Sequence, residues 1–288
     1  MDLEEYENRL DDFITELRDL ELTNSTISVY KTSLYKYLDY LKEKNIKTIT
    51  KENYIDYRDH LRNDLKFEVS NVNKYVVIIN KYFIWAGYKD KLNIKILRKQ
   101  EKHYLENVPS VSDYKRILRA AKKHDIVAYY FILIASYTGM RVSAICEIKI
   151  EDIVESRKNE SYIKIFSKNK YNEVPFPAWL RRDILKYAKE NKIKEGYLFP
   201  SPVNKGKPMT RKTMWKKVHT VTGYARVDLD KGHPHALRHL LGKEISGYIS
   251  DNQTIADIFG HESLKTTARY QQKSKREIAK IVSDFRFK

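Results

Sequence analysis

Apolar side chains recur at helical spacing in four successive stretches of residues 1–96, and this pattern limits the fold more than any other feature of the chain. Polar breaks separate the stretches and supply N-capping residues: Thr23 precedes the second stretch, and Thr50, followed by Asn53, precedes the third. The fourth stretch begins near Ser70. Each helix has one apolar stripe to bury, so the sequence predicts a small all-α domain. The stripes comprise Leu10, Phe13, Ile14 and Leu17; Ile27, Tyr30, Leu34, Tyr37, Leu38 and Leu41; Tyr54, Ile55, Tyr57 and Leu61; and Val72, Tyr75, Val76, Ile79, Phe83 and Ile84.

A linker and a second domain follow. Residues 97–109 are charged, show no apolar period and end in a proline, which is typical of a linker. Residues 110–288 form the predicted second domain, which begins with a helix from Ser112. The next helix is strongly apolar and ends at Tyr137, because the Gly that follows Thr138 breaks the pattern.

Strand patterns occur in one part of this second domain. In residues 161–166, the side chains of Tyr162, Lys164 and Phe166 alternate with those of Ile163 and Ile165, as expected for a strand. A polar turn covers 167–172, and residues 173–176 complete a predicted β-hairpin with a Lys-rich tip. Helices resume over 179–187 and again from Thr210. The predicted fold class is therefore mainly α with a small antiparallel β-sheet.

The charge balance indicates the class of partner. The chain has 55 Lys and Arg against 38 Asp and Glu, which gives a net charge of +17 at pH 7. Such an excess favours a polyanion, because each cation that neutralises a phosphate releases counterions, although ribosome-binding and membrane-surface proteins are also basic. Cys146 is the only cysteine, so no intrachain disulfide is possible. The acidic N-terminus lacks a secretory signal pattern and the apolar stretch 126–137 is too short to cross a bilayer, so we expect a cytoplasmic protein.

Two polar segments come early in the second domain. Arg141 follows the Gly break at the start of a predicted helix, where the helix N-terminus favours an anion. Lys168 and Lys170 lie at the tip of the predicted hairpin. Taken alone, Arg141 is typical of a surface or salt-bridge residue, and the two lysines are typical of a solvated turn.

Two further segments carry histidines. Pro234 opens a predicted helix that places His235, Arg238 and His239 on one face. His261 follows a helix-ending Gly, and Tyr270 lies nine residues beyond it; a single Tyr in such a place usually packs in a core. The histidines also suggest a zinc site completed by His233 or His261. However, the segment lacks the Glu that follows the first His in a zinc protease, and Arg238 between the ligands opposes a dication, so we predict no metal.

Together these side chains have the chemistry of phosphodiester transfer. Guanidinium groups hold the nonbridging oxygens, an imidazole exchanges a proton near neutral pH, and an ammonium protonates the leaving oxygen. A Tyr hydroxyl is a competent nucleophile. The candidate catalytic residues are Arg141, Lys168, His235, Arg238, His261 and Tyr270.

At these positions the sequence resembles the tyrosine recombinases, the class of lambda integrase and the Xer proteins. The family motifs T-G-[LM]-R-[IV]-S, a strand-turn Lys, H-x-[LF]-R-H and G-H-x-x-x-x-T-x-x-Y are matched in order and separation. They stand here as Thr138 to Ser143, Lys168, His235 to His239, and Gly260-His261 through Thr267 to Tyr270.

The resemblance implies an organisation and a partner. Residues 1–96 would be the helical core-binding domain, which forms a clamp around double-stranded DNA together with the catalytic domain of residues 110–288. The basic segment from Tyr197 to Val218 would place a helix on the duplex. The tail stripe of Ile278, Ile281, Val282 and Phe285 would dock on a neighbouring protomer, giving a dimer on a site and a tetramer in synapsis; alternatively, it packs on its own domain.

The same resemblance implies the role of each side chain. Tyr270 would attack the scissile phosphate and form a 3′-phosphotyrosyl bond, with Arg141 and Arg238 on the phosphate. His261 would donate a further hydrogen bond, His235 would assist proton movement at Tyr270, and Lys168 would protonate the leaving 5′-oxygen. No metal, ATP or other cofactor is implied, and the expected location is the cytoplasm, at the nucleoid.

Two positions depart from the family pattern. Ala144 stands where the family usually has an acid that helps to shape the active site. The hairpin is one residue shorter than usual between the Lys and the Val-Pro pair, which leaves Lys170 as an alternative to Lys168.

Two other functions compete with a site-specific recombinase acting in integration, excision or dimer resolution. The first is a type IB topoisomerase, which relaxes DNA without exchanging strands; the apolar tail stripe favours recombination over this. The second is an accessory protein that binds DNA without cleaving it, and the complete set of Arg, His and Tyr residues argues against it. The DNA target sequence depends on side-chain geometry in the grooves, which the sequence alone does not define.

Overall fold

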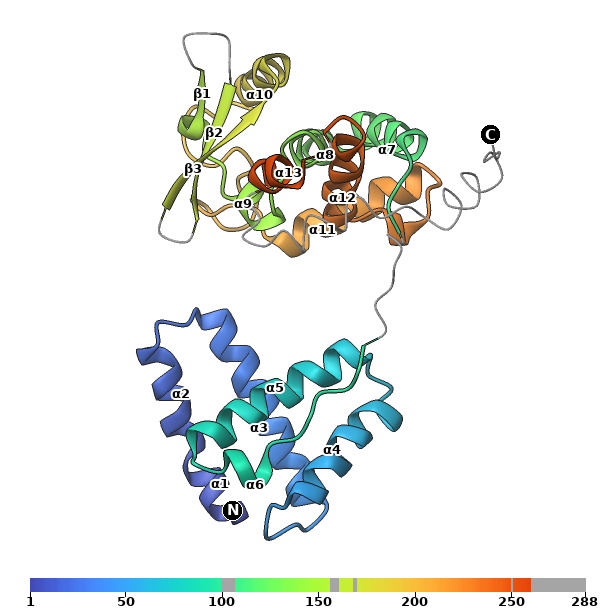
Figure 1. Ribbon diagram of the computed structural model, residues 1–288. Coiled ribbons are helices and arrows are strands. Elements are labelled where there is room, and N and C mark those ends of the chain that lie inside the picture. The colour runs from blue at the N-terminus through green and yellow to red at the C-terminus, as the bar shows by residue number, and fades with distance from the viewer. Residues whose placement is uncertain (100–106, 156–160, 168–169, 250, 260–288) are drawn as a thin grey trace, which may run out of the picture. The chain divides into compact units, whose positions relative to one another are not determined.

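The computed structural model describes residues 1–99, 107–155, 161–167, 170–249 and 251–259. The chain divides into two compact units, Met1–Glu101 and Lys102–Lys288 (Figure 1). Helices are the only elements named in the described part of the first unit, and the second unit combines helices with one three-stranded sheet. The predicted class, mainly α with a small antiparallel sheet, is confirmed.

The first unit follows the predicted stripes closely. Thr23 and Thr50 cap the helices that begin after them, and Thr50 forms a reciprocal capping box with Asn53. The first predicted helix is divided at Arg9 into two shorter ones. The helices are α1 (Leu3–Asn8), α2 (Leu10–Asp19), α3 (Asn24–Glu43), α4 (Lys51–Asn63), α5 (Val69–Trp85) and α6 (Lys89–Leu92).

The chain after α6 runs back along α5 in extended form, and two asparagines of α5 hold it (Figure 1). The Asn80 side-chain amide donates to the Ile94 carbonyl at 2.8 Å and its oxygen accepts from the Ile94 N–H at 3.2 Å. Asn73 makes the same pair of bonds with Leu97, at 2.9 and 2.8 Å. Each side chain thus satisfies a peptide group that has no strand partner.

Tyrosines fill much of the core of this unit. The rings of Tyr6, Tyr37, Tyr54, Tyr57 and Tyr82 are at most 1% exposed. The Tyr54 hydroxyl donates to the Val76 carbonyl at 3.0 Å, and those of Tyr6 and Tyr82 also donate to backbone carbonyls. The buried hydroxyl of Tyr37, by contrast, has no hydrogen-bond partner among the described residues.

The second unit is built around the apolar helix α8 (Ile126–Thr138). Eight of its residues are buried, and it contacts α7 (Val111–His124), α11 (Arg211–Tyr224) and α12 (Pro234–Ser246) (Figure 1). Asp125 caps α8 through the Ala128 N–H and also forms a 2.7 Å ion pair with Lys217. The remaining helices are α9 (Val142–Cys146), α10 (Ala178–Glu190) and α13 (Asn252–Phe259), with short 3₁₀ turns at Ile150–Asp152 and Leu229–Lys231.

The sheet differs from the prediction in two respects. A third strand, β1 (Ile153–Glu155), pairs antiparallel with β2 (Ser161–Ser167); its three residues are too few to show an alternating pattern in the sequence. The strand β3 (Lys170–Phe176) begins earlier than predicted, and Lys170 is paired with Ser167, so Lys170 belongs to a strand and not to the turn.

One helix start also differs. The helix predicted from Ser112 begins at Val111, because Ser110 is its N-cap. The Ser110 hydroxyl accepts from the Asp113 N–H at 3.1 Å, and the Asp113 carboxylate accepts from the Ser110 N–H at 3.1 Å. No helix among the described residues is long and apolar enough to cross a membrane.

The two tyrosine environments of the first unit make different predictions for stability. Tyr54→Phe removes a buried hydrogen bond to Val76 and should lower the free energy of unfolding by about 1 kcal/mol. Tyr37→Phe removes a hydroxyl that is buried without a partner in the described part, so it should leave stability unchanged or raise it. Native-state hydrogen exchange of α5 amides in the full chain measures both; equal losses would contradict this assignment.

Candidate active site

The turn between α8 and α9 presents Arg141. Thr138 is buried; its hydroxyl donates to the Ile134 carbonyl at 2.6 Å and accepts from the Met140 N–H at 3.2 Å. Gly139 ends α8 with φ of +62°, a left-handed conformation that side chains disfavour. Met140 is then directed into the core, and Arg141 becomes the exposed N-cap of α9. The predicted break and helix start are both confirmed.

The helix α12 presents the second group of predicted residues. Its start is fixed by Pro234 at the first turn and by His233, whose Nδ1 accepts from the Ala236 N–H at 3.1 Å. His235 is exposed on the helix surface, and its ring meets that of His239 edge-on at 4.8 Å between centroids. Arg238, three residues further along the same helix, is buried and only 4% exposed.

The buried guanidinium of Arg238 joins two distant parts of the chain. It donates one hydrogen bond to the Gly139 carbonyl and another to the Phe259 carbonyl, the latter at 2.8 Å. Its Cζ also lies 5.0 Å from the centroid of the Phe259 ring. Charge-assisted bonds to carbonyls and an aromatic face offset the desolvation of the cation. Arg238 is thereby held rigidly between the end of α8 and the end of α13.

Electrostatics link His235 to both arginines. Although its side chain reaches solvent, partial burial of the ring lowers the pKa of His235, and the positive charges of Arg238, His233 and Arg141 lower it further. Arg238 follows His235 by three residues on α12, and its guanidinium donates to the carbonyl of Gly139, two residues before Arg141. The structure therefore brings Arg141, His235 and Arg238 together, and the imidazole is neutral near pH 7 and able to accept a proton.

Three predicted site residues cannot be placed. Lys168, His261 and Tyr270 lie outside the described residues, as do the Gly-His pair of the motif and the tail. Lys170, the alternative to Lys168, begins β3. Ala144, at the position of the missing acid, is half-buried in α9 and packs against the main core of the second unit.

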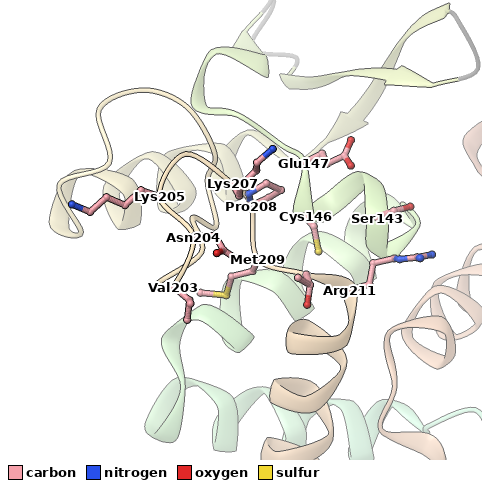
Figure 2. A pocket seen from close by; sticks show the side chains of 11 residues that line it. Ser143, Cys146, Glu147, Val203, Asn204, Lys205, Lys207, Pro208, Met209 and Arg211 are labelled. Carbon is pink, nitrogen blue, oxygen red and sulfur yellow. The ribbon is translucent and has the colours of Figure 1, made fainter. Parts of the chain in front are cut away.

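A pocket of about 770 Å³ lies beside α9, and the sequence analysis did not identify it. The helix α9 contributes Ser143 and Cys146 to one side, together with its C-cap residue Glu147, and the loop that leads to α11 forms the other side (Figure 2). That loop contributes Val203, Asn204, Lys205, Lys207, Pro208, Met209 and Thr210, and α11 contributes its first residue, Arg211. Lys205, Lys207 and Arg211 thus place three positively charged side chains around a pocket whose first lining residue, Ser143, follows Arg141 by two positions. The basic composition of this segment was its signal in the sequence.

Comparisons with known proteins agree on one family. The model of the phage integrase family matches residues 110–277, more than half of the chain. Tyrosine recombinase XerA of Pyrococcus furiosus is 26% identical over 284 residues, which cover 95% of this chain and 92% of the relative.

Solved structures show the same fold. The XerH site-specific recombinase, in a pre-cleavage complex with its difH substrate, superimposes with a TM-score of 0.73 at 18% identity, covering 96% of this chain and 84% of XerH. A lambda integrase tetramer bound to a Holliday junction gives a TM-score of 0.72 at 16% identity, covering 96% and 78%.

The charges around His235 predict its titration. We expect an imidazole pKa below the ordinary value of 6.5. Arg141→Gln removes one positive charge that disfavours the imidazolium, so the pKa of His235 should rise in this variant. Nuclear magnetic resonance titration of the imidazole, assigned with His235→Gln, measures both values. Lys207→Gln removes a positive charge from the loop before α11 and serves as the control; an unshifted pKa in Arg141→Gln would contradict the proximity of the two groups.

Proposed function

The chain belongs to the phage integrase family and is a tyrosine recombinase, and we propose that it cuts and rejoins double-stranded DNA with Tyr270 as the nucleophile. The observation that carries the proposal is the position of the buried Arg238, which lies on α12 with His235 and donates to the carbonyl of Gly139, two residues before Arg141. Two fixed positive charges beside a proton acceptor suit a phosphodiester, whose negative charge grows on the nonbridging oxygens during transfer.

The proposed reaction exchanges one phosphoester bond for another. The Tyr270 oxygen forms a bond to phosphorus while the bond from phosphorus to the 5′-oxygen breaks, which leaves a 3′-phosphotyrosyl link. His235 accepts the phenolic proton, and Lys168, or Lys170 in its place, donates a proton to the departing 5′-oxygen. Attack by a 5′-hydroxyl on the phosphotyrosine reverses the steps, so the covalent bond conserves the energy of the phosphodiester and no ATP is consumed.

Arg141 and Arg238 contribute in different ways to this step. Arg141 is exposed as the N-cap of α9, so its guanidinium is accessible to a phosphate from solvent. Arg238 is buried and fixed by two carbonyls, so it undergoes little reorganisation as charge develops. His261 is proposed as a further hydrogen-bond donor to the phosphate.

Duplex DNA is the proposed partner of both domains. Residues 1–96 would form the core-binding domain, residues 97–109 the linker and residues 110–288 the catalytic domain, with the DNA held between them. The net charge of +17 and the cations of the pocket beside α9 support phosphate contacts. The tetramer of lambda integrase on a Holliday junction supports a homo-oligomer here, and the apolar stripe of residues 278–285 is the proposed contact between protomers.

A suicide substrate tests the nucleophile. The DNA carries a nick beside the cleavage point, so the short leaving strand diffuses away and religation fails. Wild type should form an adduct that survives denaturation in EDTA, whereas Tyr270→Phe should form none, because it lacks only the attacking hydroxyl. Gel electrophoresis of labelled DNA, drawn from candidate sites near the gene, detects the adduct.

The outcomes separate the competing functions. Tight binding by both proteins without an adduct would favour the accessory protein that does not cleave, and Ala144→Glu would then test whether the missing acid is the cause. An adduct together with relaxation of supercoiled plasmid, but without exchange between two sites, would favour the topoisomerase.

The cations of the pocket predict a salt effect. Lys205→Gln and Lys207→Gln should each weaken DNA binding and reduce the slope of log K against log salt by about 1, because each removes one phosphate contact. Lys186→Gln makes the same charge change on α10, where the side chain is 73% exposed and lies 3.9 Å from Glu190. Affinities measured at several salt concentrations give the slope of each variant, and the slope of Lys186→Gln should equal that of wild type. Equal slopes for all three variants would show that the pocket does not contribute to DNA binding.

A further inference from the structure

The ring of Phe259 lies where a side chain on Gly139 would be. A Cβ atom on Gly139 would stand 2.4 Å from Cε1 and 2.7 Å from Cδ1 of Phe259, distances far inside van der Waals contact. It would also stand 3.2 Å from Cδ2 of Leu241. Gly139 is therefore required twice at this turn, once for its φ of +62° and once because the Phe259 ring occupies the space beside it.

Phe259 also contacts Arg238 through both its ring and its backbone. The guanidinium carbon lies 5.0 Å from the ring centroid, and Nη2 donates to the Phe259 carbonyl at 2.8 Å. The other guanidinium nitrogen, Nη1, donates to the Gly139 carbonyl. Each of the three residues thus contacts the other two, and we call this set the Gly139–Arg238–Phe259 contact.

This contact joins a small apolar cluster to the turn that carries Arg141. Ile255 and Phe259 of α13 form the buried centre of a cluster that is separate from the main core of the second unit. Partly buried residues around them are Leu241, Ile245, Ile249 and Ile258. Because so small a cluster buries little apolar surface, its position relative to the main core depends strongly on specific contacts such as that of Phe259 with Gly139.

We propose that Phe259 is a positioning residue: its ring and carbonyl fix Arg238 and the Gly139 turn in the geometry that phosphoryl transfer requires. The inference rests on the proposed function. Arg141 lies two residues after Gly139, and the segment proposed to carry His261 and Tyr270 follows Phe259 directly in the sequence. One aromatic side chain therefore contacts the turn that leads to Arg141 and directly precedes, in the sequence, the segment of His261 and Tyr270.

The test compares the rate of adduct formation with the affinity for DNA. Phe259→Ala should slow adduct formation at saturating suicide substrate by about 10- to 100-fold and leave Kd unchanged, because misplaced catalytic groups reduce the rate and not the number of phosphate contacts. Phe259→Leu refills the space without an aromatic face, so its rate should lie between those of Phe259→Ala and wild type. Gly139→Ala should displace the ring and slow the reaction as well.

Two control variants separate positioning from general destabilisation. Gly196→Ala places a Cβ at a φ of +76° with nothing within 4 Å, so it carries the backbone strain of Gly139→Ala without the collision. Ile255→Ala removes a fully buried side chain from the same cluster and retains the Phe259 ring. Both should react at close to the wild-type rate. If Ile255→Ala were as slow as Phe259→Ala, loss of cluster packing would explain the effect and the inference would be wrong.

Hydrogen exchange tests the contact independently of DNA cleavage. Phe259→Ala should accelerate exchange of the amides of residues 138–143, whereas Ile255→Ala should accelerate exchange mainly within α13. If wild type formed no adduct, the proposed nucleophile would fail, and the exchange data would still decide whether Phe259 holds the turn. Wild-type exchange at residues 138–143 in Phe259→Ala would overturn the inference whatever the reaction rates.

Discussion

The candidate site depends on the burial of one cation. An isolated guanidinium moved into a protein interior loses several kcal/mol of hydration free energy, and the loss is tolerated only where hydrogen bonds and nearby electron-rich groups replace the water. Arg238 obtains these from the carbonyls of Gly139 and Phe259 and from an aromatic face. Its need for acceptors draws together the ends of α8 and α13, so the charge proposed to hold a phosphate also organises the backbone around it.

Local features of the fold were predictable because their causes are local. Thr23, Thr50 and Thr210 each cap the next helix through a bond to an N–H three residues on, and Gly139 ends α8 by its own conformational freedom. The strand β1 and the early start of β3 were not predicted, because a strand is defined by its pairing with a neighbouring strand. The residue types Ser167 and Lys170 do not indicate that these two residues pair.

The site itself was predictable only in part. Motif spacing identified Arg141, His235 and Arg238, and the structure links them through α12 and the bond from Arg238 to the Gly139 carbonyl. It did not identify the contact of Phe259 with Gly139, because the two residues are far apart in the sequence and each alone has an ordinary interpretation, one as a core aromatic and the other as a helix terminator. Nor did it indicate that Arg238 is buried while His235, on the same helix, is exposed. Such differences arise from the elements that cover each face of a helix.

The tyrosine-filled core of the first unit bears on chemical selectivity. The chain has 22 tyrosines, all with the same functional group as the proposed nucleophile. Burial raises the pKa of Tyr6 and Tyr37 well above the ordinary range, and it raises the pKa of Tyr114 and Tyr187 in the second unit to about 12. Tyr6, Tyr37 and Tyr187 are at most 3% exposed, so a phosphate cannot reach their hydroxyls. Burial therefore does for these core tyrosines what a protecting group does in organic synthesis: it withdraws their phenols from reaction, whereas exposed tyrosines such as Tyr224 and Tyr248 lack this protection.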